Sequence, residues 1–280
     1  MRTELDSPLG KPAPYTEQYA PELLFPIPRA EKRREIGLTE PLPFVGEDVW
    51  NAYELSWLDA KGKPAVAVGR FRVPATTPNL IESKSLKLYL NSLNQTSFPD
   101  ADAVAVTLEK DLSAASGDKV GVEVFLPEAV PRRFASFSGS DCLDALDIDC
   151  DTHTPYASYA PEPGFLSVTE APVVEKTLYS HLLKSNCPVT GQPDWATISV
   201  RYRGRPIDAA GLLRYIVSFR RYSEFHEQCV ERIYCDLLKR CAPEALAVCA
   251  RYTRRGGIDI NPFRSNGEFP PPPDAREVRQ

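Results

Sequence analysis

The chain has 280 residues, of which 42% are hydrophobic and 25% are charged, and its formal net charge is −5. This length suits two domains or one large one, and the composition is typical of soluble globular proteins rather than disordered or fibrous ones. The negative charge argues against bulk binding of nucleic acid, because proteins that bind polyanions usually carry a basic excess.

The sequence predicts a cytoplasmic protein without a membrane or metal partner. No stretch approaches the roughly 20 apolar residues of a membrane span, and residues 1–7 lack the apolar core of a signal peptide. The seven cysteines form no CxxC pair, which suits free thiols in a reducing compartment. The three histidines form no HxxxH pair, which disfavours zinc. Aspartates concentrate between residues 141 and 151, and we interpret residues 135–164 as an acidic linker rather than a metal site.

Two segments with the same order of elements follow a Pro- and Tyr-rich stretch, residues 1–45, which is predicted to be an extended arm. Within residues 46–134 the pattern predicts strands at 65–73 and 85–90, a helix from Pro99 to a stop at Gly117, and a strand at 120–124. Within residues 165–280 it predicts strands at 196–202 and 211–219, a helix over 224–241 and a strand at 245–254. We infer a duplicated α+β unit, although such an order can also arise by chance.

A candidate nucleophile, Cys187, lies in a run of turn-forming residues seven positions before Asp194. A thiol attacks as its thiolate, so a reactive cysteine needs a nearby base, and Asp194 could be that base or a later proton donor. Pro188 and Gly191 predict a tight, exposed loop, where catalytic groups are often displayed. The alternative is a buried cysteine beside a polar turn, since free cysteine usually behaves as a small hydrophobe.

Ile81, Glu82, Ser83 and Lys84 precede the predicted second strand. The carboxylate of Glu82 could accept two N–H groups from a purine-like ring edge. The alternative is the solvent face of an edge strand.

Two further motifs carry groups suited to binding. Phe225, His226 and Glu227 begin the second predicted helix, although Glu227 could simply be an acid in the first turn, which helix N-termini favour. Arg255 and Gly256 belong to an Arg-Arg-Gly-Gly run that suits a phosphate, because glycine lets the backbone approach an anion closely. A plain turn with solvated arginines is the alternative. No GxGxxG motif follows a strand, so a Rossmann site is not indicated.

These four motifs, at residues 82–89, 187–194, 225–227 and 254–257, resemble in this order those of the NADPH-dependent 7-cyano-7-deazaguanine reductases. This family comprises the nitrile reductases of queuosine biosynthesis, and the resemblance is to its long, two-domain form. It implies a tandem tunnelling fold, in which two fused units of antiparallel sheet carry helices on one face, and it implies a homodimer. It also suggests that Glu82 has no acidic counterpart near Ala209 in the second half.

The resemblance implies a role for each motif. Cys187 would attack the nitrile carbon of the 7-deazaguanine substrate to form a covalent thioimide, Asp194 would transfer protons, and two NADPH would each supply a hydride. His226 would lie beside the base and could relay a proton. The remaining substrate contacts would be Ile81, Glu82, Ser83 and Glu227, and the NADPH contacts would be Ser83, Lys84, Arg255 and Gly256.

Two other classes of protein remain as alternatives. One is a related tunnelling-fold enzyme that acts on pterins or GTP, typically through a metal. The other is a noncatalytic purine-binding protein, which would not need Cys187 or Asp194.

Overall fold

The structure is a computed structural model that describes residues 15–131, 134–149 and 160–280. The chain divides into two compact units. The first unit comprises residues 1–39, 47–132 and 254–260, and the second comprises residues 40–46, 133–253 and 261–280. Cys150, Asp151 and His153, which belong to the predicted acidic linker, lie outside the described residues.

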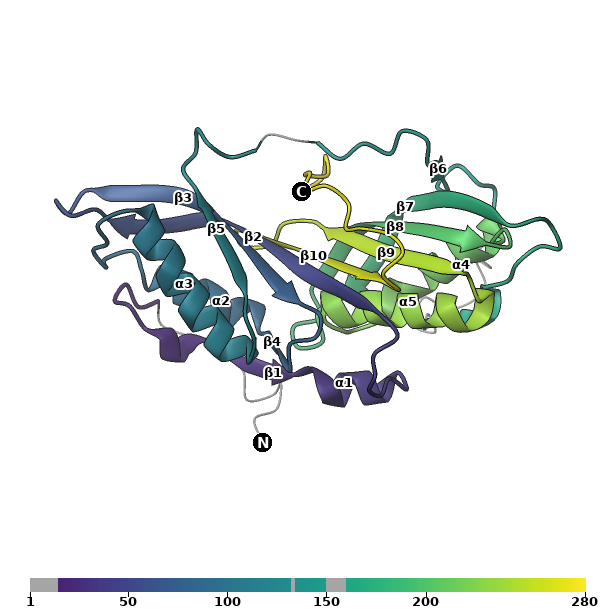
Figure 1. Cartoon of the computed structure of the whole chain (residues 1–280), viewed down its shortest axis with the longest axis horizontal. Coiled ribbons are helices and arrows are strands. Elements are labelled where there is room, and N and C mark those ends of the chain that lie inside the picture. The colour runs from purple at the N-terminus through teal and green to yellow at the C-terminus, as the bar shows by residue number, and fades with distance from the viewer. Residues whose placement is uncertain (1–14, 132–133, 150–159) are drawn as a thin grey trace. The chain divides into compact units, whose positions relative to one another are not determined.

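The first unit is an antiparallel sheet with two helices on one face (Figure 1). Its strands lie in the order β5-β3-β2, and a separate short pair joins β1 to β4. The elements in chain order are β1 (Pro26–Pro28), α1 (Arg29–Glu35), β2 (Val45–Leu58), β3 (Pro64–Pro74), β4 (Asn79–Ile81), α2 (Ser83–Asn91), α3 (Ala101–Ser116) and β5 (Gly121–Phe125).

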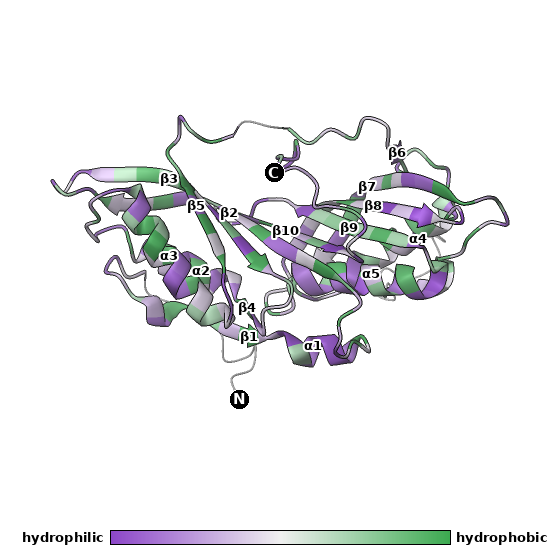
Figure 2. Cartoon of the chain, viewed as in Figure 1, coloured by the Kyte–Doolittle hydropathy of each residue, from purple (hydrophilic) through white to green (hydrophobic). Residues whose placement is uncertain are grey.

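Helix α3 begins and ends where the sequence predicts. Asp100 caps it by accepting a hydrogen bond of 2.8 Å from the Ala103 N–H, and Gly117 ends it in the left-handed region at φ +82°. Val104, Leu108 and Leu112 lie on one face and are buried in the core of this unit. Hydrophobic and hydrophilic residues accordingly alternate along α3 (Figure 2). The predicted strands at 65–73 and 120–124 are also confirmed, as β3 and β5.

The predicted strand at 85–90 is wrong, because these residues form helix α2. Leu86, Leu88 and Leu90 alternate as in a strand, but Leu86, Tyr89 and Leu90 also match the three- and four-residue spacing of a helix face. The segment contains no β-branched residue, and leucine and lysine favour helix. Glu82 supplies an N-cap, which settles the choice.

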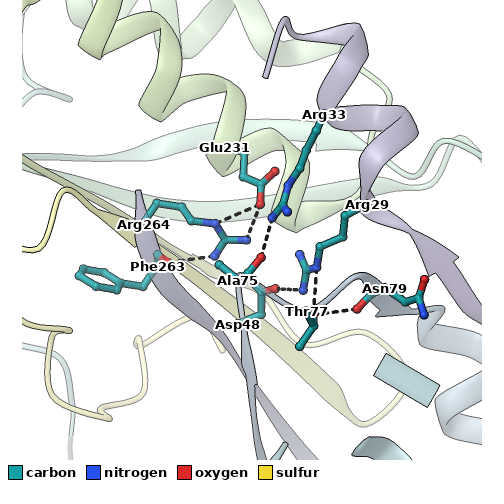
Figure 3. A network of polar contacts seen from close by, with 9 residues as sticks. All are labelled: Arg29, Arg33, Asp48, Ala75, Thr77, Asn79, Glu231, Phe263 and Arg264. Carbon is teal, nitrogen blue, oxygen red and sulfur yellow. Dashed lines mark hydrogen bonds and ion pairs between the residues drawn. The ribbon is translucent and has the colours of Figure 1, made fainter. Parts of the chain in front are cut away.

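The predicted arm contains a helix that hydropathy does not reveal. Helix α1 is almost entirely hydrophilic (Figure 2), so it has no apolar stripe to detect. Its buried contacts are ionic and polar instead: Arg29 lies 2.6 Å from Asp48 and also donates to Thr77, while Arg33 donates to the carbonyl of Ala75 at 2.7 Å (Figure 3). The extended interpretation is therefore wrong over Arg29–Glu35.

The second unit is a sheet in the order β10-β9-β8-β7-β6, antiparallel except for the short β6–β7 pair, with its helices on one face (Figure 1). Three of its elements, β8, β9 and α5, confirm the predicted strands at 196–202 and 245–254 and the predicted helix at 224–241. The elements in chain order are β6 (Asp141–Cys142), β7 (Val174–Asn186), β8 (Pro193–Gly204), α4 (Ala209–Ser218), α5 (His226–Cys241), β9 (Ala245–Tyr252) and β10 (Ile258–Ser265), the last of which begins in the first unit.

The predicted strand at 211–219 is also wrong, because helix α4 occupies these residues. Asp208 caps α4 by accepting from the N–H groups of Ala210 and Gly211, at 3.3 and 3.1 Å.

Below the sheet, the Glu231 carboxylate of α5 pairs at 2.9 Å with the guanidinium of Arg264, and both side chains are almost fully buried (Figure 3).

The two units share one order of elements, which differs from the predicted order by one helix. Each has two strands, two helices and a further strand, and the strand neighbours correspond as β5-β3-β2 and β9-β8-β7. The first hairpin of each unit also has a register shift at the same place, between Ala52 and Leu55 in one and between Ser180 and Leu183 in the other. These shared irregularities support the inferred duplication.

Candidate active site

Cys187 is the first residue of the turn that joins β7 to β8. Its N–H donates to the carbonyl of Gln192 at 2.9 Å, and its carbonyl accepts from Gly191, whose φ of +67° favours glycine. The tight turn predicted from the prolines and glycine is thus confirmed, and residues 190–193 are exposed. The Cys187 thiol itself is not exposed with the loop, since the residue is buried and only 3% exposed. A buried thiol at the base of an exposed turn is protected from bulk solvent.

The β7–β8 hairpin accounts for the spacing between Cys187 and Asp194. Asp194 lies opposite Ser185 in the strand register, so both ends of the seven-residue interval return to the same end of the hairpin. The Asp194 carboxylate is 5% exposed, and its Oδ1 lies 3.5 Å from Nε2 of His226. An acid and an imidazole therefore meet beside the turn that carries the thiol.

His226 and Glu227 are the first two residues of helix α5, after Phe225 at the N-cap. Glu227 is 2% exposed, and its place in the first turn suits a carboxylate because the helix N-terminus carries partial positive charge. The imidazole of His226 faces Asp194 through Nε2 and also contacts the ring of Tyr252, with ring centroids 4.1 Å apart. The structure thus places these motif residues at one end of the second unit's sheet.

Three buried residues near Asp194 were not predicted from the sequence. They are Ser185 at the end of β7, Cys229 in the first turn of α5 and Tyr252 at the end of β9, each at most 1% exposed. Burial raises the pKa of the Cys229 thiol to about 12, with Glu224 and Asp194 adding to the rise. Cys229 therefore remains a neutral thiol near pH 7, unlike a nucleophile.

Glu82 caps helix α2 in the first unit. Its Oε1 accepts from the Lys84 N–H at 2.6 Å, and its Oε2 accepts from the Ser85 N–H at 2.8 Å. The carboxylate is fully buried, and burial raises its pKa against the opposing effect of these N–H donors. These residues therefore open a helix that begins at Ser83, rather than preceding the predicted strand.

Glu82 has an acidic counterpart in the second unit, contrary to the expectation for the region near Ala209. Asp208 caps α4 through the N–H groups two and three positions ahead, as Glu82 caps α2. A capping role is therefore common to both carboxylates. What distinguishes Glu82 is its full burial, since Asp208 is partly exposed.

Arg255 precedes a two-residue turn of the first unit, which is formed by Gly256 and Gly257. The backbone of Arg255 pairs with that of Ile258, and Gly256 and Gly257 both have positive φ, at +56° and +77°. A Cβ on Gly256 would clash with Nζ of Lys87, and burial lowers the pKa of Lys87, assisted by Arg255. Lys87 was not predicted as a site residue.

The structure thus groups the predicted residues within each unit. Cys187, Asp194, His226 and Glu227 belong to the second unit, whereas the first unit holds Ile81, Glu82, Ser83, Lys84, Arg255 and Gly256. Ile81 itself ends β4, where it pairs with Pro26 and is buried. In the described part of the chain, no three His, Cys, Asp or Glu side chains are grouped so that they could hold a metal ion. None of the described helices has both the length and the hydropathy that crossing a membrane requires.

Two family models match the chain. Residues 15–124 match the model described as "Nitrile reductase, 7-cyano-7-deazaguanine-reductase N-term", and residues 193–270 match the model described as "QueF-like protein". The first match contains β4 and α2 with Glu82, and the second contains Asp194, α5 and the glycine turn.

Curated relatives match nearly the whole chain. Proteins named NADPH-dependent 7-cyano-7-deazaguanine reductase from Dechloromonas aromatica (strain RCB) and Azoarcus sp. (strain BH72) are 62% and 60% identical, each over 98% of this chain and 95% of the relative. The relative of that name from Bordetella avium is 57% identical over 98% of both chains. A solved structure, of the archaeosine synthase QueF-Like in the apo form, is 17% identical over 36% of this chain and all of its own, with a TM-score of 0.31 that is too low to establish a shared fold.

Proposed function

Because the chain belongs to the family of NADPH-dependent 7-cyano-7-deazaguanine reductases, we propose that it reduces the nitrile of 7-cyano-7-deazaguanine to an aminomethyl group in queuosine biosynthesis. The observation that carries this proposal is the contact between Asp194 and His226 at the end of the hairpin that presents Cys187. Together they provide a nucleophile and two proton-transfer groups in a buried site.

The first step is the addition of the Cys187 thiol across the nitrile. The sulfur forms a bond to the nitrile carbon while the thiol proton passes to the nitrogen through Asp194, and a thioimide results. A nitrile is a weak electrophile, so this addition divides a four-electron reduction into two manageable steps.

The remaining steps add two hydrides and two protons. Asp194 or His226 gives a proton to the nitrogen as the carbon receives a hydride, which NADPH would supply when bound. The carbon–sulfur bond then breaks, the sulfur regains its proton, and an imine is left. A second hydride and proton convert the imine to the amine. The imine must be kept from water, and we assign this to Phe225 or the arm.

Four further residues suit the deazaguanine ring of the substrate. Glu82 and Glu227 would accept N–H groups of the deazaguanine edge, with the main chain of Ile81 and Ser83 contributing. Glu82 keeps acceptor capacity beyond its two capping bonds, because a carboxylate has about four lone-pair positions.

NADPH would lie along Ser83, Lys84, Arg255 and Gly256. The turn at Gly256 fits a phosphate, because it lacks the Cβ that would fill the space beside the Lys87 amino group. Lys84 and Lys87 are three positions apart on one helix, so both amino groups face the same side.

We also propose that the protein is a cytoplasmic homodimer in which each chain consists of two fused tunnelling-fold units. It would bind neither nucleic acid nor membrane. The repeated order of elements supports the fused units, and the net charge of −5 supports the absence of nucleic acid.

Steady-state assay tests the proposed function directly. The purified protein, given 7-cyano-7-deazaguanine and NADPH, should release the aminomethyl compound and consume two NADPH for each nitrile. Binding of the nitrile without oxidation of NADPH would instead support the noncatalytic purine-binding alternative, and a requirement for stoichiometric zinc would support the metal-dependent alternative.

A further inference from the structure

The ring of Tyr252 packs against the imidazole of His226. Tyr252 is the last residue of β9, its backbone lies opposite Ala196 of β8, and its side chain is 1% exposed. Its ring is tilted by 54° to the imidazole with centroids 4.1 Å apart, which is van der Waals contact. The same imidazole faces Asp194 through Nε2 at 3.5 Å. The ring of Tyr252 therefore limits the rotation of an imidazole that also contacts Asp194.

The hydroxyl of Tyr252 contributes less to the structure than its ring does. It is buried and forms no hydrogen bond of ordinary length and angle with the described residues, and the same holds for the neighbouring hydroxyl of Ser185. The Cys229 thiol lies near enough to influence its pKa, and burial raises that pKa well above the usual value. The hydroxyl therefore stays protonated throughout the working range of an enzyme.

We propose that Tyr252 is a positioning residue for the reduction, and that its ring holds the imidazole of His226 against Asp194. This inference rests on the proposed function, because it assigns Tyr252 a role through two groups that transfer protons there. Proton transfer requires heavy atoms at hydrogen-bond distance, so a small rotation of the imidazole would slow turnover without removing any group that binds substrate.

Three substitutions separate the ring from the hydroxyl. Tyr252→Leu removes the aromatic ring, and we expect kcat to fall by about 10- to 100-fold, with a much smaller change in KM for the nitrile. Tyr252→Phe keeps the aromatic ring, so we expect its kcat to remain close to that of the unchanged protein. Its Tm should change little, because the lost hydroxyl has no hydrogen bond of ordinary length and angle in the described structure.

Tyr202→Leu is the matched control for loss of a buried strand tyrosine in the same unit. Tyr202 is also 1% exposed, but its hydroxyl accepts from the Ile207 N–H at 3.1 Å, and it takes no part in the site. We expect the Tm of this variant to fall, whereas the kcat of its folded form should be unchanged. If Tyr252→Leu does not fold, Tyr252→Met replaces it with the same expectation, and the Phe variant remains an independent test.

The outcomes distinguish this inference from the proposed function. The unchanged protein must first reduce the nitrile, and failure at that stage refutes the proposed function before any variant is compared. Once turnover is established, equal losses of kcat in Tyr252→Phe and Tyr252→Leu would show that the hydroxyl matters rather than the ring. A loss of kcat in Tyr202→Leu as large as in Tyr252→Leu, or a rise in KM that accounts for the whole effect, would also overturn the positioning role.

Discussion

Replacing Glu82 with alanine should cost both stability and substrate affinity, whereas the same change at Asp208 should cost stability alone. The cap at Glu82 makes two short bonds from a fully buried carboxylate, at 2.6 and 2.8 Å. Loss of an N-cap of this kind destabilises a protein by about 2 kcal/mol, the upper end of the usual range. The bonds of Asp208 are longer, at 3.1 and 3.3 Å, and about 1 kcal/mol is expected there.

Thermal unfolding and calorimetric titration with 7-cyano-7-deazaguanine measure the two effects separately. We expect Tm to fall by roughly 4 °C for Glu82→Ala and roughly 2 °C for Asp208→Ala. Loss of charged hydrogen bonds to the substrate should raise Kd by about 30-fold for Glu82→Ala, equivalent to about 2 kcal/mol, and leave it unchanged for Asp208→Ala. The reasoning is refuted if both variants bind the nitrile as tightly as the unchanged protein, because Glu82 would then be only a cap.

The pH dependence of stability gives a second check on the same carboxylate. Burial raises the pKa of Glu82 in the folded state above its ordinary value of 4.5. The folded protein therefore holds this proton more tightly than the unfolded chain does, and stability increases as pH falls through the raised pKa toward 4.5. Glu82→Gln cannot titrate, so the Tm of the unchanged protein should rise relative to that of the variant on acidification. A parallel course of the two Tm curves would contradict the raised pKa.

Four more substitutions test the catalytic and cofactor assignments. Cys187→Ala should abolish the covalent adduct that mass spectrometry detects. Cys229→Ala should keep the adduct, because burial raises the pKa of the Cys229 thiol to about 12. An adduct that survives Cys187→Ala would identify another nucleophile. Asp194→Asn should lower kcat by about 100-fold or more with a smaller change in affinity, as expected for a proton-transfer group, and unchanged turnover would remove Asp194 from the mechanism. Gly256→Ala should raise KM for NADPH, because the new Cβ would displace the Lys87 amino group from a turn with φ of +56°; an unaltered KM would place the cofactor elsewhere.

Local signals in the sequence predicted the elements that have a single consistent pattern. Helix α3 has an aspartate cap, an apolar face and a terminal glycine, and all three agree. Helices α2 and α4 were predicted as strands, because Leu86, Leu88 and Leu90 alternate and because the end of α4 carries residues that favour strands. Their acidic caps were the decisive signal in both cases.

Buried charge explains why the sequence did not reveal helix α1. Its Arg29 pairs with Asp48 of β2, which is fully buried, and the helix has no stripe of apolar residues. Strand β2 does bury apolar residues, but a register shift between Ala52 and Leu55 interrupts their alternation. Hydrophobic periodicity detects elements that bury apolar faces, and it misses those held by paired charges. A single sequence does not show which charged residues will pair in the folded protein.

The candidate site was predictable where its chemistry lies in short motifs. Cys187 and Asp194 are joined by one hairpin, and the contact between Asp194 and His226 follows from the fold of a single unit. Tyr252 was missed because it is one of several apolar residues in a buried strand, and only the tertiary structure brings it to His226. Lys87 was missed because the wrong strand assignment separated it from Lys84, whereas the helix places both on one side.

The most direct test of the central claim is mass spectrometry of the protein mixed with 7-cyano-7-deazaguanine in the absence of NADPH, followed by addition of NADPH. Addition of a thiol to a nitrile loses no atoms, so the protein mass should rise by the full mass of the substrate, and peptide mapping should place the increase at Cys187. NADPH should then restore the original mass as the aminomethyl product appears. An unmodified Cys187 during active turnover would contradict the covalent mechanism.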